Sequence, residues 1–177
     1  MFNFKIKPLV FAFSISFSSC VFADEKSGFF VIADTGVTKL SAPSTTEYSL
    51  SSNSYNLGLG FESGRTSVEF TYGSGFYLSS TYGSSTDTFE ITNWTLALNY
   101  KILNEGNFRP YIGLGRYGGT VNITGQSTEN YGRNIYNVGL EIPLDTTSSI
   151  RIKYFQSFEL SGYGTYSGTS AGLLYRF

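Results

Sequence analysis

The sequence predicts an all-β fold, an eight-stranded antiparallel up-and-down transmembrane β-barrel, and three observations lead to it. Eight segments alternate apolar and polar residues with a period of two, which is typical of strands whose two faces meet different environments. Short and long connections alternate between these segments. Charged residues are 14% of the chain and aromatic residues 18%, an unusual composition for a soluble domain.

Residues 1–23 have the pattern of a cleaved secretory signal peptide. Lys5 and Lys7 form a basic start, an apolar run extends from Leu9 to Phe17, and the small residue Ala23 ends the segment. The run is too short to span a bilayer, which needs ~20 residues. An N-terminal anchor or a buried strand is the alternative interpretation.

Cys20 offers a second alternative, because it lies in a sequence that is similar to a lipoprotein cleavage box. Phe17 stands where such a box usually has Leu, so we expect cleavage after Ala23 without lipidation. The mature chain, residues 24–177, is then a single barrel domain without cysteine.

The eight predicted strands follow one another without a helix between them. They are residues 28–38, 54–63, 65–77, 88–102, 109–118, 133–144, 149–159 and 168–177. In the first four, the apolar face carries Phe29, Val31, Ala33 and Val37; Leu57, Leu59 and Phe61; Val68, Phe70 and Tyr72; and Trp94, Leu96, Leu98 and Tyr100. In the last four, it carries Ile112 and Leu114; Tyr136, Val138, Leu140 and Ile142; Ile150, Ile152 and Tyr154; and Ala171, Leu173, Tyr175 and Phe177.

The connections predict the orientation of the barrel. Residues 62–65, 103–108 and 145–148 form short turns, whereas residues 39–53, 78–87, 119–132 and 160–167 form longer loops rich in Ser, Thr, Gly, Asn and Tyr. Outer-membrane barrels have short periplasmic turns and longer extracellular loops. We therefore expect four extracellular loops and a C-terminus on the periplasmic side.

The apolar face is expected to contact lipid. In the alternative, a soluble barrel of the lipocalin type, that face would point inward. The opposite face, however, is rich in glycine at Gly58, Gly60, Gly113, Gly115 and Gly139, and glycine in a strand is useful where space is short, as inside an eight-stranded barrel. Aromatic residues near the strand ends fit the two membrane interfaces.

Charged residues on the second face are expected to line the interior. Four are acidic and four basic: Asp34, Glu62, Glu69, Glu141, Lys101, Arg151, Lys153 and Arg176. Buried charges are costly unless they are paired, so the equal numbers predict a paired network that fills the lumen. A gated polar path is the alternative. Arg116 fits the pattern poorly, since its register points outward. Either it lies at the level of the outer headgroups, or a bulge turns it inward.

The mature chain resembles the small outer-membrane barrels of Gram-negative bacteria, of the OmpA/OmpX and opacity types. Residues 28–40, GFFVIADTGVTKL, resemble the first strand of that family, and residues 108–115, FRPYIGLG, resemble its fifth. The ending Leu173-x-Tyr175-x-Phe177 is similar to the signal that the barrel-assembly machinery reads in this class. The resemblance implies location in the cell outer membrane, contact with outer-membrane lipid and lipopolysaccharide, and roles such as anchoring, adhesion, serum resistance or a small pore.

The residue types present disfavour catalysis. The chain has no His, and after signal removal no Cys, so we expect no enzyme, no His/Cys metal site and no cofactor. The sequence contains no basic patch, so we do not expect the protein to bind nucleic acid. We expect a monomeric barrel whose loops bind an extracellular ligand through tyrosines in or beside them, namely Tyr48, Tyr55, Tyr82, Tyr131, Tyr163 and Tyr166. A small passive pore for polar solutes is the alternative.

Overall fold

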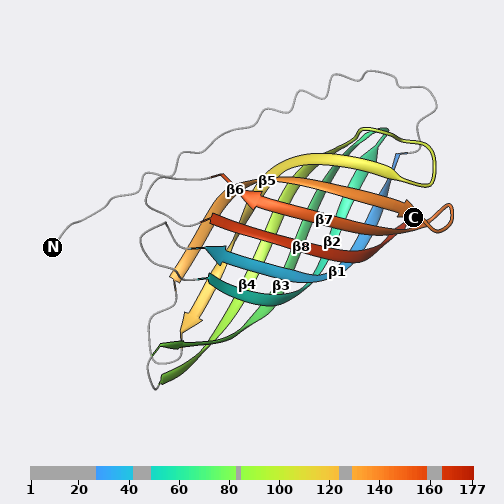
Figure 1. Cartoon of the computed structure of the whole chain (residues 1–177). Helices are drawn as coiled ribbons and strands as arrows, with labels where there is room; N and C mark the ends of the chain where they lie inside the picture. Colours follow the sequence, from blue (N-terminus) through green and yellow to red (C-terminus); the bar gives the residue numbers. More distant parts are fainter. Residues whose placement is uncertain (1–26, 42–48, 83–84, 124–128, 159–164) are drawn as a thin grey trace.

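The computed structural model describes residues 27–41, 49–82, 85–123, 129–158 and 165–177, and the predicted signal peptide lies outside them. These residues form eight long strands wound around one axis (Figure 1). The strands are β1 (Ser27–Ser41), β2 (Ser49–Ser63), β3 (Thr66–Tyr82), β4 (Ser85–Lys101), β5 (Arg109–Ile123), β6 (Glu129–Pro143), β7 (Ser148–Ser157) and β8 (Thr165–Arg176). No helix in the described part of the chain has the length and hydropathy of a membrane span.

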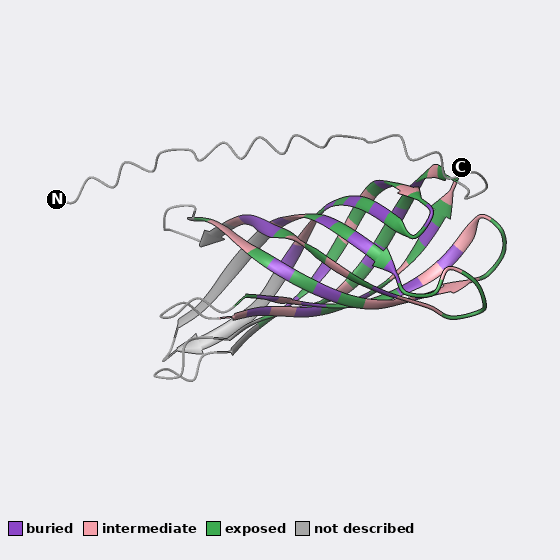
Figure 2. Cartoon of the chain, turned by 90° about the horizontal axis from the view of Figure 1, so that it is seen from above, coloured by how far each residue is buried: buried purple, intermediate pink, exposed green. Residues whose placement is uncertain are grey.

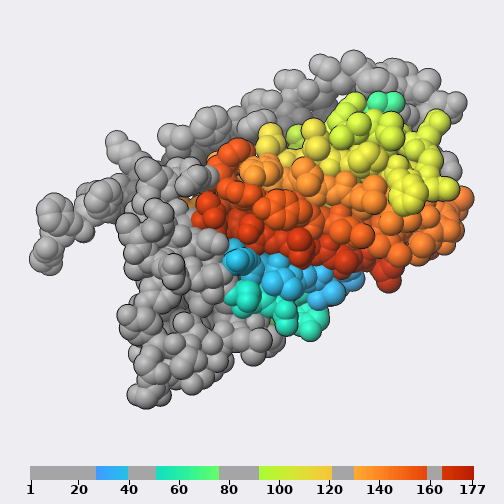
Figure 3. Space-filling view, viewed as in Figure 1, coloured from blue at the N-terminus to red at the C-terminus, as the bar shows by residue number. Residues whose placement is uncertain are grey.

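The sheet closes on itself. Each strand pairs antiparallel with the next, and β1 pairs with β8 from Phe30 opposite Arg176 to Ser41 opposite Thr165. Figure 3 shows this junction from outside, where the first and last strands lie side by side in one wall. Closure leaves no strand edge unpaired, which is the condition for a sheet to span a membrane. The predicted fold class is therefore confirmed.

The strands extend further into the polar segments than the sequence predicts. At the short-turn end the predicted bounds are within one residue of the observed ones, but at the other end most strands are three to five residues longer. For example, β2 begins at Ser49 instead of residue 54, and β5 continues to Ile123. Main-chain pairing needs no apolar side chain, and Ser, Thr and Tyr tolerate the extended backbone. The predicted long loops were thus too long.

The apolar face of the wall points outward. Along each strand, buried and exposed residues alternate (Figure 2). Leu57 and Leu59 are 71% and 61% exposed, whereas Phe30 and Leu174, on the opposite face, are almost fully buried. A soluble barrel with its apolar face inside is therefore excluded, because Leu57 and Leu59 would then be buried.

Aromatic side chains form two bands on the outer face. At the short-turn end lie Phe29, Phe61, Tyr100, Tyr175 and Phe177, and two pairs of these rings make edge contacts, Phe29 with Phe61 and Tyr175 with Phe177. Nearer the long-loop end lie Tyr55, Tyr72, Trp94, Tyr136 and Tyr154. Aromatic girdles of this kind mark the two interfaces of a membrane-spanning barrel.

Two inner glycines make room for large side chains in the lumen. A Cβ at Gly60 would overlap the ring of Phe30, and a Cβ at Gly139 would overlap the ring of Tyr111. The rings occupy the space that other residues at these positions would fill. The interior is therefore packed with side chains, as expected for a barrel of eight strands.

Candidate functional site

The interior holds a charge cluster near the short-turn end, centred on Glu141. The Glu141 carboxylate accepts a hydrogen bond from Arg176 Nη2 at 2.6 Å and lies 3.6 Å from both Lys101 Nζ and Arg109 Nη1. Glu62 joins the cluster through Lys101 at 2.7 Å and Arg176 at 3.5 Å. Because Glu141 is 1% exposed, its charge depends on these three cations rather than on water.

A second charge cluster, centred on Glu69, lies deeper in the barrel. Arg151 Nη1 donates to Glu69 Oε2 at 2.5 Å, and Lys153 Nζ donates to Oε1 at 3.3 Å. Lys153 also lies 3.8 Å from the carboxylate of Asp34, which accepts a hydrogen bond from the Asn56 amide at 2.7 Å. The Arg151 guanidinium packs 4.6 Å from the centre of the Tyr111 ring. Each charge of this cluster therefore has an opposite charge or an aromatic face beside it.

Strand register brings these side chains together. Glu141 lies opposite Arg109 in β5 and opposite Arg151 in β7, and all three project inward because residues two apart share a face. Lys101 and Arg176 reach the same level from β4 and β8. All eight residues that the sequence places inside lie on the inner wall, and the structure divides them into the Glu141 and Glu69 clusters.

Arg109 is a member of the Glu141 cluster that the sequence analysis did not include. Its inward position could have been predicted, since Arg109 is an even number of residues from Gly113 and Gly115, which the sequence analysis assigned to the inner face. The sequence analysis did not assign Arg109 to the interior because it is the first residue of its strand.

An aromatic layer lies in the lumen nearer the long-loop end. Tyr117, Ile135, Phe155 and Tyr166 are buried together, with Tyr131 packed against them. The rings of Tyr117 and Phe155 stack with centres 5.3 Å apart, and those of Tyr131 and Tyr166 stack at the same separation and almost parallel. The five residues come from β5, β6, β7 and β8, so the layer connects the four consecutive strands that form one half of the wall.

Two tyrosines of this layer correct the sequence analysis. Tyr131 and Tyr166 were assigned to extracellular loops, but they belong to β6 and β8 and lie inside the barrel. Tyr55 lies on the outer face of β2, where it is exposed. Of the other three, Tyr82 ends β3, and Tyr48 and Tyr163 lie outside the described residues.

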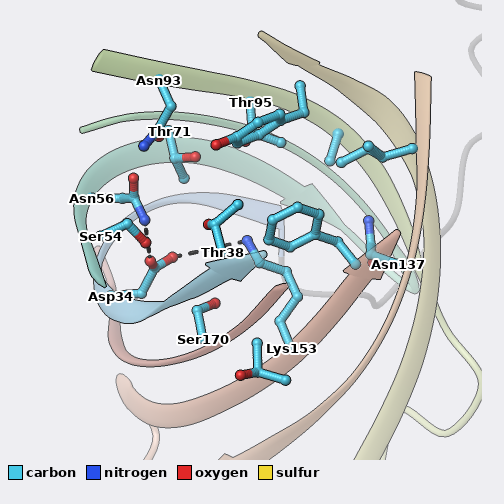
Figure 4. Close-up of a pocket in the computed structure, with 15 residues that line it drawn as sticks. Asp34, Thr38, Ser54, Asn56, Thr71, Asn93, Thr95, Asn137, Lys153 and Ser170 are labelled. Atoms are coloured by element: carbon cyan, nitrogen blue, oxygen red, sulfur yellow. Dashed lines mark hydrogen bonds and ion pairs between the residues drawn. The ribbon is translucent and has the colours of Figure 1, made fainter. Parts of the chain in front are cut away.

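A small polar cavity separates the Glu69 cluster from the aromatic layer. The residues that line it include Asp34, Asn56, Asn137, Lys153, Tyr117 and Phe155. In Figure 4, Lys153 and Asn56 both point at Asp34. The cavity offers about 20 Å³ to the centre of a water molecule. A single water needs about 10–15 Å³ on this measure, so the cavity has room for one or two waters. The buried Oδ1 atoms of Asn56 and Asn137 lack a partner among the described side chains and suit such a water.

Arg116 lies on the outer face, as its register indicates. It is exposed, between Leu96 of β4 and Asn134 of β6, and no bulge turns it inward. Among the described residues, no group of three or more His, Cys, Asp or Glu side chains is arranged to hold a metal ion. The described interior therefore offers ion pairs, stacked rings and a cavity of the size of a water molecule.

Comparison with known proteins shows which barrels share this architecture. No family model matches the chain, and no curated protein matches its sequence. Among solved structures, Neisserial surface protein A matches over 86% of this chain and all of its own, with a TM-score of 0.64 and 17% identity. The chain has the fold of the small outer-membrane β-barrels.

Two further barrels have the same fold. Ail, the attachment invasion locus protein of Yersinia pestis, matches over 87% of this chain and all of its own, with a TM-score of 0.54 and 16% identity. The outer membrane protein OprG of Pseudomonas aeruginosa matches over 86% of this chain and 97% of its own, with a TM-score of 0.55 and 14% identity. At such identities the similarity shows the shared fold alone, and the role of the side chains in this lumen has to be inferred from their own contacts.

Proposed function

We propose that this chain is a non-conducting, monomeric outer-membrane barrel that binds partners at the cell surface through its long-loop end. The observation that carries the proposal is that side chains fill the lumen at successive levels. The Glu141 cluster, the Glu69 cluster and the aromatic layer follow one another along the barrel, and the cavity between the last two has room for one or two waters. A continuous water path would require these side chains to move apart.

Membrane insertion is supported by the outer face of the wall. Exposed Leu57, Leu59, Leu98 and Leu114 form an apolar surface between the two aromatic bands, and such a surface would be unfavourable in water. The barrels that share the fold are outer-membrane proteins, which supports the same location here. We further propose that residues 1–23 direct export and are removed, and that no lipid is attached to Cys20.

Surface binding is supported by the composition of the connecting segments. Residues 42–48, 124–128 and 159–164 carry Ser, Thr, Tyr, Gly and Gln with few charges, which is typical of adaptable polar binding surfaces. Ail, an attachment protein by its name, shares the fold, which supports attachment as the class of function. Because the chain has no His and the ionisable groups inside are held in ion pairs, we propose no enzymatic role.

Two measurements test the proposal. The purified barrel in a planar bilayer should give no stable, ion-selective openings, and such openings would favour the alternative of a small pore.

Cells that display the barrel should adhere to at least one surface in a panel of immobilised neutral glycans and matrix glycoproteins. A variant with residues 42–48 and 159–164 replaced by Gly-Ser segments should lose adhesion while remaining folded. Equal adhesion of both barrels would contradict binding through the loops.

A further inference from the structure

The outer face carries a cation that has no partner among the described residues. Arg116 forms no ion pair with the described residues, unlike the inner cations. Among the described side chains on the outer faces of the strands, the only charged groups are Arg116 and Lys39, and both are positive. Lys39 lies on β1, on the opposite side of the closed barrel from β5. An unpaired guanidinium beside apolar side chains needs an anion or water close by.

Two facing glycines shape the surface around this cation. Gly118 of β5 lies directly opposite Gly132 of β6. A Cβ at Gly132 would lie 3.2 Å from Arg116 Nη2 and 3.5 Å from Nε, so the guanidinium rests on the backbone of β6 at this point. A Cβ at Gly118 would lie 2.9 Å from Cζ2 of Trp94, so the indole covers the second glycine. We call Trp94, Arg116, Gly118 and Gly132 the Arg116 patch.

The Arg116 patch lies at the boundary of the apolar surface on the side of the long loops. On β5, Ile112 and Leu114 precede Arg116 on the outer face, and Thr120, which shares a 2.6 Å hydrogen bond with Thr92, follows. Gly132 lies opposite Gly118, which is two residues closer to the long-loop end than Arg116. Because the Arg116 guanidinium lies beside Gly132, the side chain extends toward that end. Long basic side chains at a membrane interface extend in this way to reach the headgroups.

We propose that the Arg116 patch binds a phosphate on the headgroup of lipid A, the phosphorylated glucosamine lipid of the outer leaflet. A guanidinium binds phosphate through two parallel hydrogen bonds, and the patch supplies no competing carboxylate among its described residues. The long-loop end of such a barrel faces the cell exterior, which selects the outer leaflet as the source of the phosphate. The exposed part of the Trp94 ring offers an apolar face to the adjoining sugar ring.

The inference rests on the outer-membrane location proposed above and not on what the loops bind. Trp94 is the single tryptophan of the chain, so its fluorescence reports on this patch alone. The full mature barrel, folded in an uncharged maltoside detergent, is titrated with bisphosphorylated lipid A, with dephosphorylated lipid A and with phosphatidylglycerol. Folding of every variant is checked by its heat-modifiable migration in gels.

We expect the Trp94 emission to saturate with bisphosphorylated lipid A at a concentration at least tenfold lower than with either other lipid. Arg116→Gln should abolish this difference, and so should Gly132→Leu, which fills the place of the guanidinium. Lys39→Gln, which removes the other cation on the described part of the outer face, should leave the titration unchanged.

Three results would overturn the proposal. The first is an unchanged titration in folded Arg116→Gln, and the second is equal saturation by the dephosphorylated lipid. The third is equal saturation by phosphatidylglycerol, because it would assign the patch to phospholipid phosphate instead of lipid A. None of these results would affect the conductance or adhesion measurements, so this inference and the proposed function can fail separately.

Discussion

Glu69 is the residue at which the internal charge balance can be tested most directly. Its side chain is 1% exposed and neutralises two cations at once, Arg151 at 2.5 Å and Lys153 at 3.3 Å. Glu69→Gln preserves the shape of the side chain but removes its charge. Lys153 then keeps Asp34, 3.8 Å away, and Arg151 keeps the face of the Tyr111 ring and Glu141 on the facing strand.

The expected loss of stability follows from these remaining contacts. Removing one partner of a buried pair typically costs ~3–5 kcal/mol, because the other charge is left without compensation. A cation–π contact such as that of Arg151 with Tyr111 is worth about 0.5–2 kcal/mol and persists in the variant. We therefore expect Glu69→Gln to lower the free energy of unfolding by about 3 kcal/mol, at the lower end of that range.

Urea titration of the barrel in phospholipid vesicles, followed by Trp94 fluorescence, measures this loss. Glu105→Gln is a matched control: Glu105 is an exposed acid in the turn between β4 and β5, and its change should stay within about 0.5 kcal/mol of wild type. The double variant Glu69→Gln, Arg151→Met should lose less than the two single variants together, by about 1–3 kcal/mol. Strict additivity, or a Glu69→Gln barrel as stable as the control, would refute the idea that charge imbalance is what destabilises the interior.

Three further predictions concern the outer face, a turn and the last strand. Leu98→Arg should destabilise the inserted barrel by about 2–4 kcal/mol in the same titration, while Leu98→Met should be nearly neutral, since the exposed Leu98 side chain lies in the apolar surface. The pKa of Asp145 lies below its ordinary value because the Thr147 and Ser148 amides and the Thr147 hydroxyl donate hydrogen bonds to its carboxylate. These hydrogen bonds stabilise the turn fully above the pKa of Asp145 in the unfolded chain, and the stabilisation is lost as the pH falls through the lower pKa of the folded state. Asp145→Ala should therefore speed amide exchange in the turn near neutral pH, and an equal difference from wild type at a pH below the folded pKa would contradict this. Deleting Phe177 should lower the outer-membrane yield in cells far more than Phe177→Tyr, and equal yields would argue against an assembly signal at Leu173, Tyr175 and Phe177.

Strand parity is the part of this protein that its sequence determined by itself. Because successive side chains point to opposite faces, the alternation around Leu57 or Val138 assigns every neighbouring residue to the lumen or to the outside. The inward positions of Glu69 and Arg151, and the outward position of Arg116, follow from this local rule. The strand ends at the short turns were also predicted to within one residue, and Gly64 and Gly106, whose φ angles are positive, lie in two of these turns.

The partners of each side chain were decided only by the tertiary structure. Glu69 of β3 meets Arg151 of β7, 82 residues away, because closure of the sheet sets how far each strand is staggered against the others. Tyr131 and Tyr166 were misplaced for a related reason: their polar neighbours are typical of loops, yet main-chain pairing continues through them and carries both rings into the lumen. The same stagger sets Gly118 opposite Gly132 and so places Arg116 and Trp94 on one patch. Alternation is a property of a single strand, whereas these contacts depend on the relative shift of strands around a closed barrel, which no single segment of sequence encodes.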